Sequence, residues 1–184
     1  MSRFAARLLL LTLSLALLTL TACTTTTVDD DDSHGGWQSE TVDGITLRWR
    51  TEEGLLQVEL TAPTTGWLAV GFDPGTGMLR ANIIIGYVQA GIPWTRDDYG
   101  DATDSHRSDV SAGGSNDILS TNGIEENGST TLYFWIPLDS GDYRDRLLEA
   151  GESYSVILFY GDDDADDFES APRFTTTTTI EIPE

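Results

Sequence analysis

Few side chains in this 184-residue chain are suited to nucleophilic catalysis or to binding a transition metal. The chain has one cysteine, Cys23, and two histidines, His34 and His106, and Met78 is its only methionine besides the first residue. A serine triad would have to use His106 as its base, and no Gly-x-Ser-x-Gly motif is present. Two histidines and one cysteine, far apart in the sequence, do not form a zinc-binding pattern. We therefore expect a protein without catalysis of its own.

Carboxylates are abundant, which makes calcium the metal to consider. In "GDDDADDFESAPR", Asp162, Asp164 and Asp166 occupy alternate positions, as ligands do in a calcium-binding loop. The sixth position, however, is Asp167 instead of glycine, and the twelfth is Arg173 instead of glutamate. A helix-loop-helix calcium site is therefore excluded. A looser calcium site here, or in "TRDDYGDATDSH", is the alternative to a solvated acidic loop.

The charge of the chain is strongly negative. The formal net charge is −21, and there is no lysine. Such a surface repels nucleic acids and anionic lipid head groups, so neither is an expected partner. Two explanations remain open, which are adaptation to high salt and an acidic face for a cationic partner. The spread of acidic residues over the whole chain favours the first.

The N-terminal segment has the composition of a bacterial lipoprotein signal, predicted over residues 1–22. Two arginines precede the leucine-rich run 8–20, which is too short for the about 20 residues that span a membrane. The box Leu20–Cys23 then predicts acylation of Cys23, with an ordinary secretory signal as the alternative. The acidic segment 23–36 would be a flexible tether. We expect the chain to be anchored in the cell envelope, on the extracytoplasmic side.

Residues 37–184 are predicted to form one all-β domain. Apolar residues alternate with polar ones in segments such as "GITLRWRTEEG", where Ile45, Leu47 and Trp49 would share one face of a strand. "TGWLAVGFD" and "ANIIIGYV" are continuously apolar, which is typical of strands covered on both faces. A short helical turn is expected over Tyr143–Glu149. The pattern predicts an antiparallel β-sandwich of about nine to eleven strands.

Several of these segments together carry a resemblance to a known family. They are "GWLAVGFDPGTGMLRANIIIGYV", "DDYGDATDSHRSD", "PLDSGD" and "YSVILFYGDDDADDF". This succession resembles the DOMON domain, a β-sandwich also found in dopamine β-monooxygenase-like proteins and in cytochrome domains of extracellular dehydrogenases. The resemblance covers about Trp37 to Ile182.

The resemblance implies a ligand site. Cytochrome-like members hold a b-type haem between a methionine in the loop after the Gly-Trp strand and a histidine near the C-terminal hairpin. Met78 falls on the methionine position, whereas the segment Glu169–Arg173, where the histidine is expected, contains none. His106 is the only other imidazole of the domain. Aromatic residues expected near the ligand are Trp94, Tyr99, Trp135 and Tyr160.

The sequence thus supports a lipid-anchored module that binds a sugar or another small ligand. The alternative is an electron-transfer domain with b-type haem, in which Met78 is an axial ligand to the iron. Met78 could instead simply fill the core, and a purely structural role at the envelope is a third option. The expected partners are membrane lipid through acylated Cys23 and either a small ligand or a redox protein.

Overall fold

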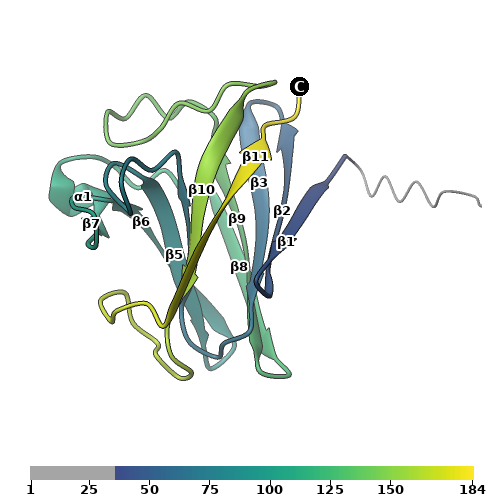
Figure 1. Ribbon diagram of the computed structural model, residues 1–184, viewed down its shortest axis with the longest axis vertical. Coiled ribbons are helices and arrows are strands. Elements are labelled where there is room, and N and C mark those ends of the chain that lie inside the picture. Colours follow the sequence, from purple (N-terminus) through teal and green to yellow (C-terminus); the bar gives the residue numbers. More distant parts are fainter. Residues whose placement is uncertain (1–35) are drawn as a thin grey trace, which may run out of the picture. The chain divides into compact units, whose positions relative to one another are not determined.

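The computed structural model describes residues 36–184, which form eleven strands and one short helix. The strands make two antiparallel sheets packed face to face (Figure 1). The five-stranded sheet has the order β1 (Gln38–Val42), β2 (Ile45–Glu52), β3 (Leu55–Ala62), β9 (Ser129–Pro137), β8 (Ser120–Glu126). The six-stranded sheet has the order β11 (Phe174–Glu181), β10 (Ser153–Tyr160), β4 (Leu68–Phe72), β5 (Asn82–Gln89), β6 (Ile92–Tyr99), β7 (Arg107–Ser108). The predicted antiparallel β-sandwich is confirmed.

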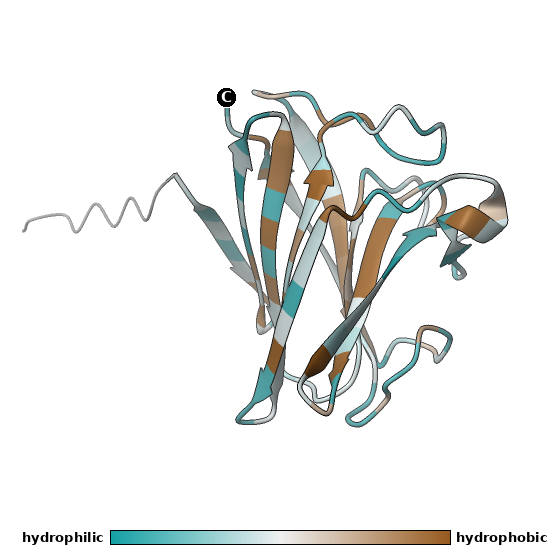
Figure 2. Cartoon of the chain, turned by 180° about the vertical axis from the view of Figure 1, so that it is seen from behind, coloured by the Kyte–Doolittle hydropathy of each residue, from teal (hydrophilic) through white to brown (hydrophobic). Residues whose placement is uncertain are grey.

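Alternation of side chains builds the five-stranded sheet. In β2, Ile45, Leu47 and Trp49 are buried while the residues between them are half-buried. The same period of two appears in β9, and Figure 2 shows it as alternating brown and teal bands along the strands. One face of this sheet therefore packs in the sandwich core and the other meets solvent.

The six-stranded sheet is covered on both faces at its centre. Strand β4 is buried at all five positions, and β5 at its first five. Side chains such as Val70 and Leu158 pack in the core between the sheets. The intervening residues, including Trp67 and Phe159, form a second apolar cluster on the outer face, together with Met78. Loops that cross this outer face close the second cluster, which explains the continuous apolar runs in the sequence.

The helix is not where the sequence placed it. The segment 143–149 contains no helix, because the chain there runs along the end of β9 and the Leu148 N–H donates to the Leu138 carbonyl (2.9 Å). Instead α1 (Asp109–Ala112) forms in the connection after β7. The Ser108 Oγ accepts from the Ser111 N–H, and Gly113 ends the helix at φ 91°. Within residues 36–184 no helix is long and apolar enough to cross a membrane.

Candidate functional site

A cavity of about 240 Å³ lies over the outer face of the six-stranded sheet. Its walls come from three loops that are distant in the sequence, namely the β4–β5, β6–β7 and β10–β11 connections. The lining residues are Met78, Asp104, Ser105, His106, Phe168, Glu169, Ser170, Ala171 and Pro172. The cavity therefore has an apolar floor and a partly acidic rim.

The β4–β5 connection places Met78 at the floor of the cavity. Met78 is 5% exposed and packs with the second apolar cluster. Its N–H donates to the carbonyl of Thr103 (3.0 Å), and the Arg80 N–H donates to the carbonyl of Gly100 (2.7 Å). A Cβ on Gly77, which has φ +61°, would lie 2.1 Å from the Thr103 oxygen. Glycine at position 77 thus allows the Met78 loop to bond directly to the loop that carries His106.

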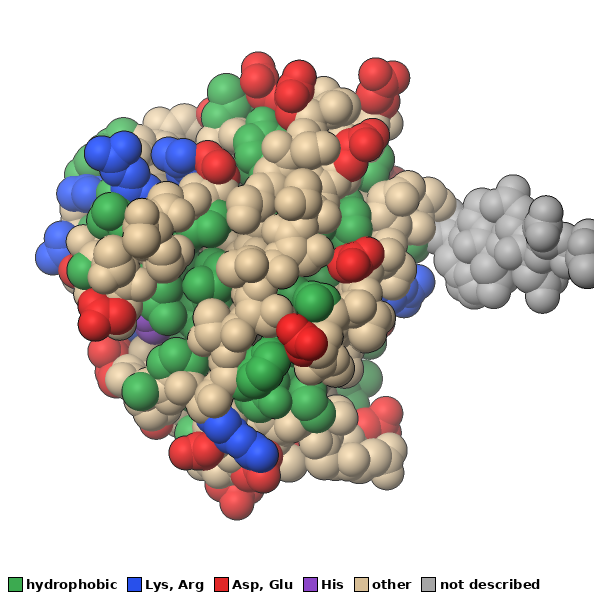
Figure 3. All heavy atoms as spheres, in the orientation of Figure 1, with side chains coloured by type: hydrophobic (Ala, Val, Ile, Leu, Met, Phe, Trp, Pro, Cys, Tyr) green, Lys and Arg blue, Asp and Glu red, His purple; other side chains and the backbone are tan. Residues whose placement is uncertain are grey.

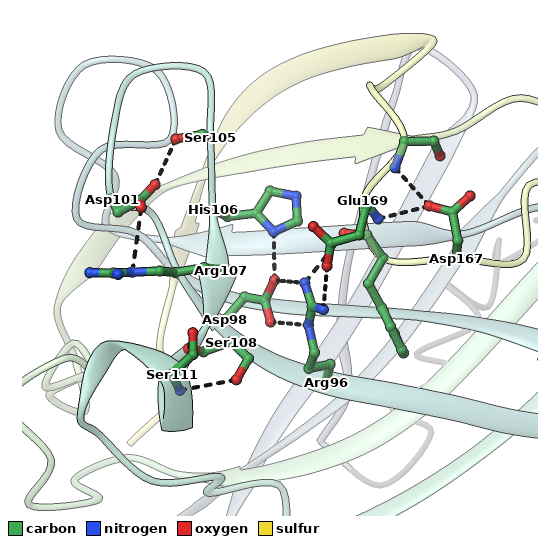
Figure 4. A network of polar contacts seen from close by, with 12 residues as sticks. Arg96, Asp98, Asp101, Ser105, His106, Arg107, Ser108, Ser111, Asp167 and Glu169 are labelled. Carbon is green, nitrogen blue, oxygen red and sulfur yellow. Dashed lines mark hydrogen bonds and ion pairs between the residues drawn. The ribbon is translucent and has the colours of Figure 1, made fainter.

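The β6–β7 connection places His106 on the same cavity, in a fixed orientation. Its Nδ1 lies 2.5 Å from Asp98 Oδ2, and the ring lies against Phe159, with 6.3 Å between ring centroids. Asp98 is fully buried and also accepts two hydrogen bonds from Arg96, at 2.6 and 2.7 Å (Figure 4). When Nδ1–H donates to Asp98, the neutral imidazole carries its lone pair on Nε2. Figure 4 shows this second nitrogen on the side of the ring away from Asp98.

The β10–β11 connection, drawn in yellow-green at the lower left of Figure 1, forms the remaining wall. Trp67 Nε1 donates to Ser170 Oγ (2.7 Å), and Arg96 Nη1 donates to Glu169 Oε1 (2.7 Å). The carboxylate of Asp167 accepts from the N–H groups of Ser170 and Glu169, and these bonds lower its pKa. This wall is therefore held to the sheet by β4 and β6, and it is braced by its own acidic residue.

The structure brings together two of the residues that the sequence singled out, Met78 and His106. It also places residues 169–172 at the same cavity, which belong to the segment Glu169–Arg173 in which the family pattern led us to expect a histidine. The distance along the chain gave no sign of this proximity, because the three loops meet only after the sheet has formed.

The four aromatic residues that the sequence placed near a ligand do not line this cavity. Trp94 is 50% exposed near the β5–β6 turn, and Trp135 is 41% exposed on the other sheet. Tyr160 packs in the core between the sheets, stacked on Phe174. Tyr99 lies under the guanidinium of Arg144, 4.7 Å from its ring centroid. Strand alternation sends these side chains to other surfaces of the sandwich.

The predicted calcium ligands Asp162, Asp164 and Asp166 do not converge. Asp164 Oδ1 accepts from Thr65 Oγ1 (3.2 Å), and Asp166 Oδ2 accepts from Gln89 Nε2 (3.3 Å). The side chain of Asp162 is 82% exposed. These three carboxylates bind separate partners at the edge of the sandwich, so the loop does not assemble a calcium site from them in this structure.

Sequence reasoning missed the groups that orient the lining residues. Arg96 and Asp98 lie on the outer face of β6, two residues apart, and Asp98 bonds to His106. The signal was present in "WTRDDY", where an arginine and an aspartate share one face of a strand whose neighbours are otherwise apolar. Trp67, which donates to Ser170, was part of the segment that carries the family resemblance, and its sequence position gave no sign of this contact.

Acidic residues are spread over the surface rather than gathered at the cavity. Figure 3 shows red side chains distributed over the visible face, whereas most of the blue basic side chains gather at the upper left. Cys23, His34 and the predicted signal and tether lie outside the described residues.

Comparison with known proteins identifies relatives of this fold. A family model described as "DOMON domain" matches residues 42–161. The cytochrome b domain of pyranose dehydrogenase from Coprinopsis cinerea has a similar structure, with a TM-score of 0.55 and 10% sequence identity, over 78% of this chain and 80% of that one. The cytochrome domain of Myriococcum thermophilum cellobiose dehydrogenase gives a TM-score of 0.54 and 9% identity, over 79% of this chain and 81% of that one. No curated protein sequence matches the chain significantly.

Proposed function

Because the chain belongs to the DOMON domain family, we propose that its cavity binds haem b and that the domain carries single electrons. The observation that carries this proposal is the meeting of Met78 and His106 at one cavity. Two structures of the same fold are cytochrome domains, and this similarity also supports haem binding. The domain itself would supply no catalytic step and would serve a redox partner.

The donor set of the cavity fits a haem iron. Met78 offers a thioether sulfur, and His106 offers an imidazole nitrogen, which is the ligand pair that raises the potential of cytochrome haems. The carboxylate of Asp98 behind the imidazole is the outer partner that histidine ligands usually have. Phe168, Ala171 and Pro172 provide apolar contact for a flat ring. When bound, haem supplies one-electron exchange between ferric and ferrous iron.

The protein would set the properties of the cofactor through four side chains. Met78 is 95% buried, so its sulfur meets little water. Asp98 would keep His106 in one orientation and raise its basicity. Glu169 and Asp104 would add negative charge at the rim, which stabilises the oxidised iron and favours a partner with a cationic face.

The size of the cavity favours a second candidate. Its 240 Å³ lies below the about 300 to 1,000 Å³ of most small-molecule sites, so a macrocycle requires the 168–172 loop to move outward. A small polar ligand fits without such movement, and the hydroxyls of Ser105 and Ser170 could bond to it. Binding of a sugar or another small ligand is therefore the function to test beside haem.

Titration with haem b separates the two candidates. The purified chain should bind one equivalent, with a Soret band that shifts on reduction. His106→Phe and Met78→Leu should each weaken binding at least about tenfold, because each removes a donor while keeping most of the side-chain volume. His34→Ala is the matched control, since it removes the only other histidine, and it should bind as the wild type does.

A chain that gives no saturable haem spectrum would refute the first candidate. A sugar panel monitored by melting temperature then tests the second. Stabilisation by a sugar that disappears in His106→Phe would place that ligand in this cavity, whereas no stabilisation by any member would contradict it.

We also propose an envelope location through acylation of Cys23, which rests on the box Leu20–Cys23 alone. Two or more acyl chains would anchor the chain stably, because each buried CH₂ contributes about 0.8 kcal/mol. A Cys23→Ser variant should leave the membrane fraction. If it stayed there with unchanged mobility, the lipoprotein assignment would be wrong.

A further inference from the structure

Four carboxylates from separate segments gather at the β6 and α1 corner of the sandwich. Asp97 lies on the inward face of β6, and Asp109 is the first residue of α1. Asp117 precedes β8, and Asp145 lies in the β9–β10 connection. Carboxylate oxygens of Asp97, Asp117 and Asp145 all lie within 4.8 Å of one another. Figure 1 shows α1 beside β6 and β7 at this corner.

The described residues provide little compensation for this charge. Asp97 Oδ2 accepts from the Asp117 N–H (2.8 Å), whereas Asp97 Oδ1 and Asp145 Oδ1 are buried without a hydrogen-bond partner. Among residues 36–184 no ion pair reaches any of the four carboxylates. Burial raises the pKa of Asp97 to about 8, although the Asp117 N–H opposes the shift. Burial also raises the pKa of Asp145 to about 6.

Asp97 is the observation that points to a ligand. It belongs to the converging group, it is only 3% exposed, and its Oδ1 has no hydrogen-bond partner among the described residues. Asp109 is a second buried carboxylate without a hydrogen-bond partner, and electrostatic repulsion couples it to Asp97 and to Asp145. The guanidinium of Arg144 acts on Asp109 in the opposite sense, yet burial and the acidic neighbours still raise the pKa of Asp109 to about 7. In their charged form such buried carboxylates are strongly unfavourable unless a cation joins them.

We propose that Asp97, Asp117 and Asp145 bind one calcium ion, with Asp109 adding negative charge beside them. All donors are carboxylate oxygens, the hard ligands that Ca²⁺ prefers, and no thiol or imidazole belongs to the group. Mg²⁺ demands a stricter octahedral geometry and gives up its water reluctantly, so a group made of protein carboxylates favours Ca²⁺.

The site would have a structural consequence. It would join β6, the segment before β8 and the β9–β10 connection, which are distant from one another in the sequence. The other face of β6 carries Asp98 and Arg96, which hold His106 and the cavity wall. Calcium would therefore stiffen the strand from which the cavity is organised.

Calorimetric titration with CaCl₂ tests this proposal on the full chain after EDTA treatment and dialysis. We expect one Ca²⁺ per chain, a rise in melting temperature, and weaker binding of Mg²⁺. Asp97→Asn and Asp145→Asn should each lower calcium affinity at least about tenfold. Asp162→Asn, which removes an exposed carboxylate elsewhere, is the matched control and should bind as the wild type does.

The half-buried Asp145 and Asp117 keep the test decisive if Asp97→Asn fails to fold, because Asp145→Asn and Asp117→Asn then serve in its place. The proposal is overturned if the wild type shows neither saturable calcium binding nor a shift in melting temperature. It is equally overturned if these variants bind calcium as tightly as Asp162→Asn does. Haem titration of the same samples tests the cavity independently, so a failure of calcium binding can be told apart from a failure of haem binding.

Discussion

The contact between the Met78 loop and the His106 loop rests on a glycine, and replacing Gly77 with alanine should disrupt it. Gly128 offers a matched control, because it also has a positive φ, +77° against +61°, but a Cβ there would meet nothing within 4 Å. At Gly77 the Cβ would lie 2.1 Å from the Thr103 carbonyl oxygen. Both variants thus pay the cost of a left-handed φ at alanine, but only Gly77→Ala adds a steric overlap with the Thr103 carbonyl.

The magnitudes follow from these two geometries. Left-handed φ costs a non-glycine residue about 1–2 kcal/mol, which is the expected loss for Gly128→Ala. Gly77→Ala adds overpacking of about 1–3 kcal/mol and the loss of the Met78 to Thr103 hydrogen bond, about 1 kcal/mol. We therefore expect Gly77→Ala to lose at least about 2 kcal/mol more of unfolding free energy than Gly128→Ala.

Urea unfolding followed by tryptophan fluorescence measures this difference, and haem titration of the same variants measures its effect on the cavity. Gly77→Ala should also bind haem more weakly, whereas Gly128→Ala should not. Equal loss of stability in the two variants would refute the packing argument. Unchanged ligand binding in Gly77→Ala would refute the claim that this contact positions Met78.

Three further predictions concern the groups that support the cavity. Asp98→Asn should lower haem affinity about 10- to 100-fold, because the carboxylate orients the imidazole of His106. Asp101→Asn should leave haem affinity unchanged. Equal haem affinity of the two variants, measured by haem titration, would contradict the role of Asp98. The hydrogen bonds from the Ser170 and Glu169 N–H groups lower the pKa of Asp167 below its ordinary 3.8. The stability that these bonds contribute is therefore fully present above about pH 4 and is lost as the pH falls through the lowered pKa. Because Asp167→Asn lacks this carboxylate, its unfolding free energy should depend less on pH in the acid range than that of the wild type. Trp67→Phe removes the hydrogen-bond donor to Ser170 and should lower the unfolding free energy in urea by about 1–2 kcal/mol. Amide hydrogen exchange in residues 168–172 should also become faster. Unchanged exchange there would show that this hydrogen bond does not hold the 168–172 wall of the cavity.

The fold was accessible from sequence because its signals are local. Alternation in β2 marked a half-buried strand, and continuous apolar runs marked β4 and β5 as covered on both faces. The helix was misplaced. The segment "YRDRLLEAG" has helical composition, but the Leu148 N–H donates to the Leu138 carbonyl just after β9 instead of to a carbonyl within a helix. The real helix is only four residues long, and its signal was the Ser108 cap followed by two glycines.

The candidate sites depend on contacts that no spacing reveals. Met78 and His106 are 28 residues apart in the sequence numbering and meet because β5 and β6 return the chain to the same end of the sheet. Sequence singled them out because such side chains are rare here and because Met78 falls on a ligand position of the family. The carboxylates of the calcium proposal are the opposite case, since they are hidden among 31 acidic residues and only their convergence in the folded chain distinguishes them.

The central claim is that Met78 and His106 are partners in one site, and the spectrum of the ferric, haem-loaded chain tests it most directly. We predict a low-spin spectrum with the charge-transfer band that a methionine sulfur gives with ferric haem, and loss of that band in Met78→Leu. A high-spin spectrum that is the same in wild type and Met78→Leu would contradict the claim.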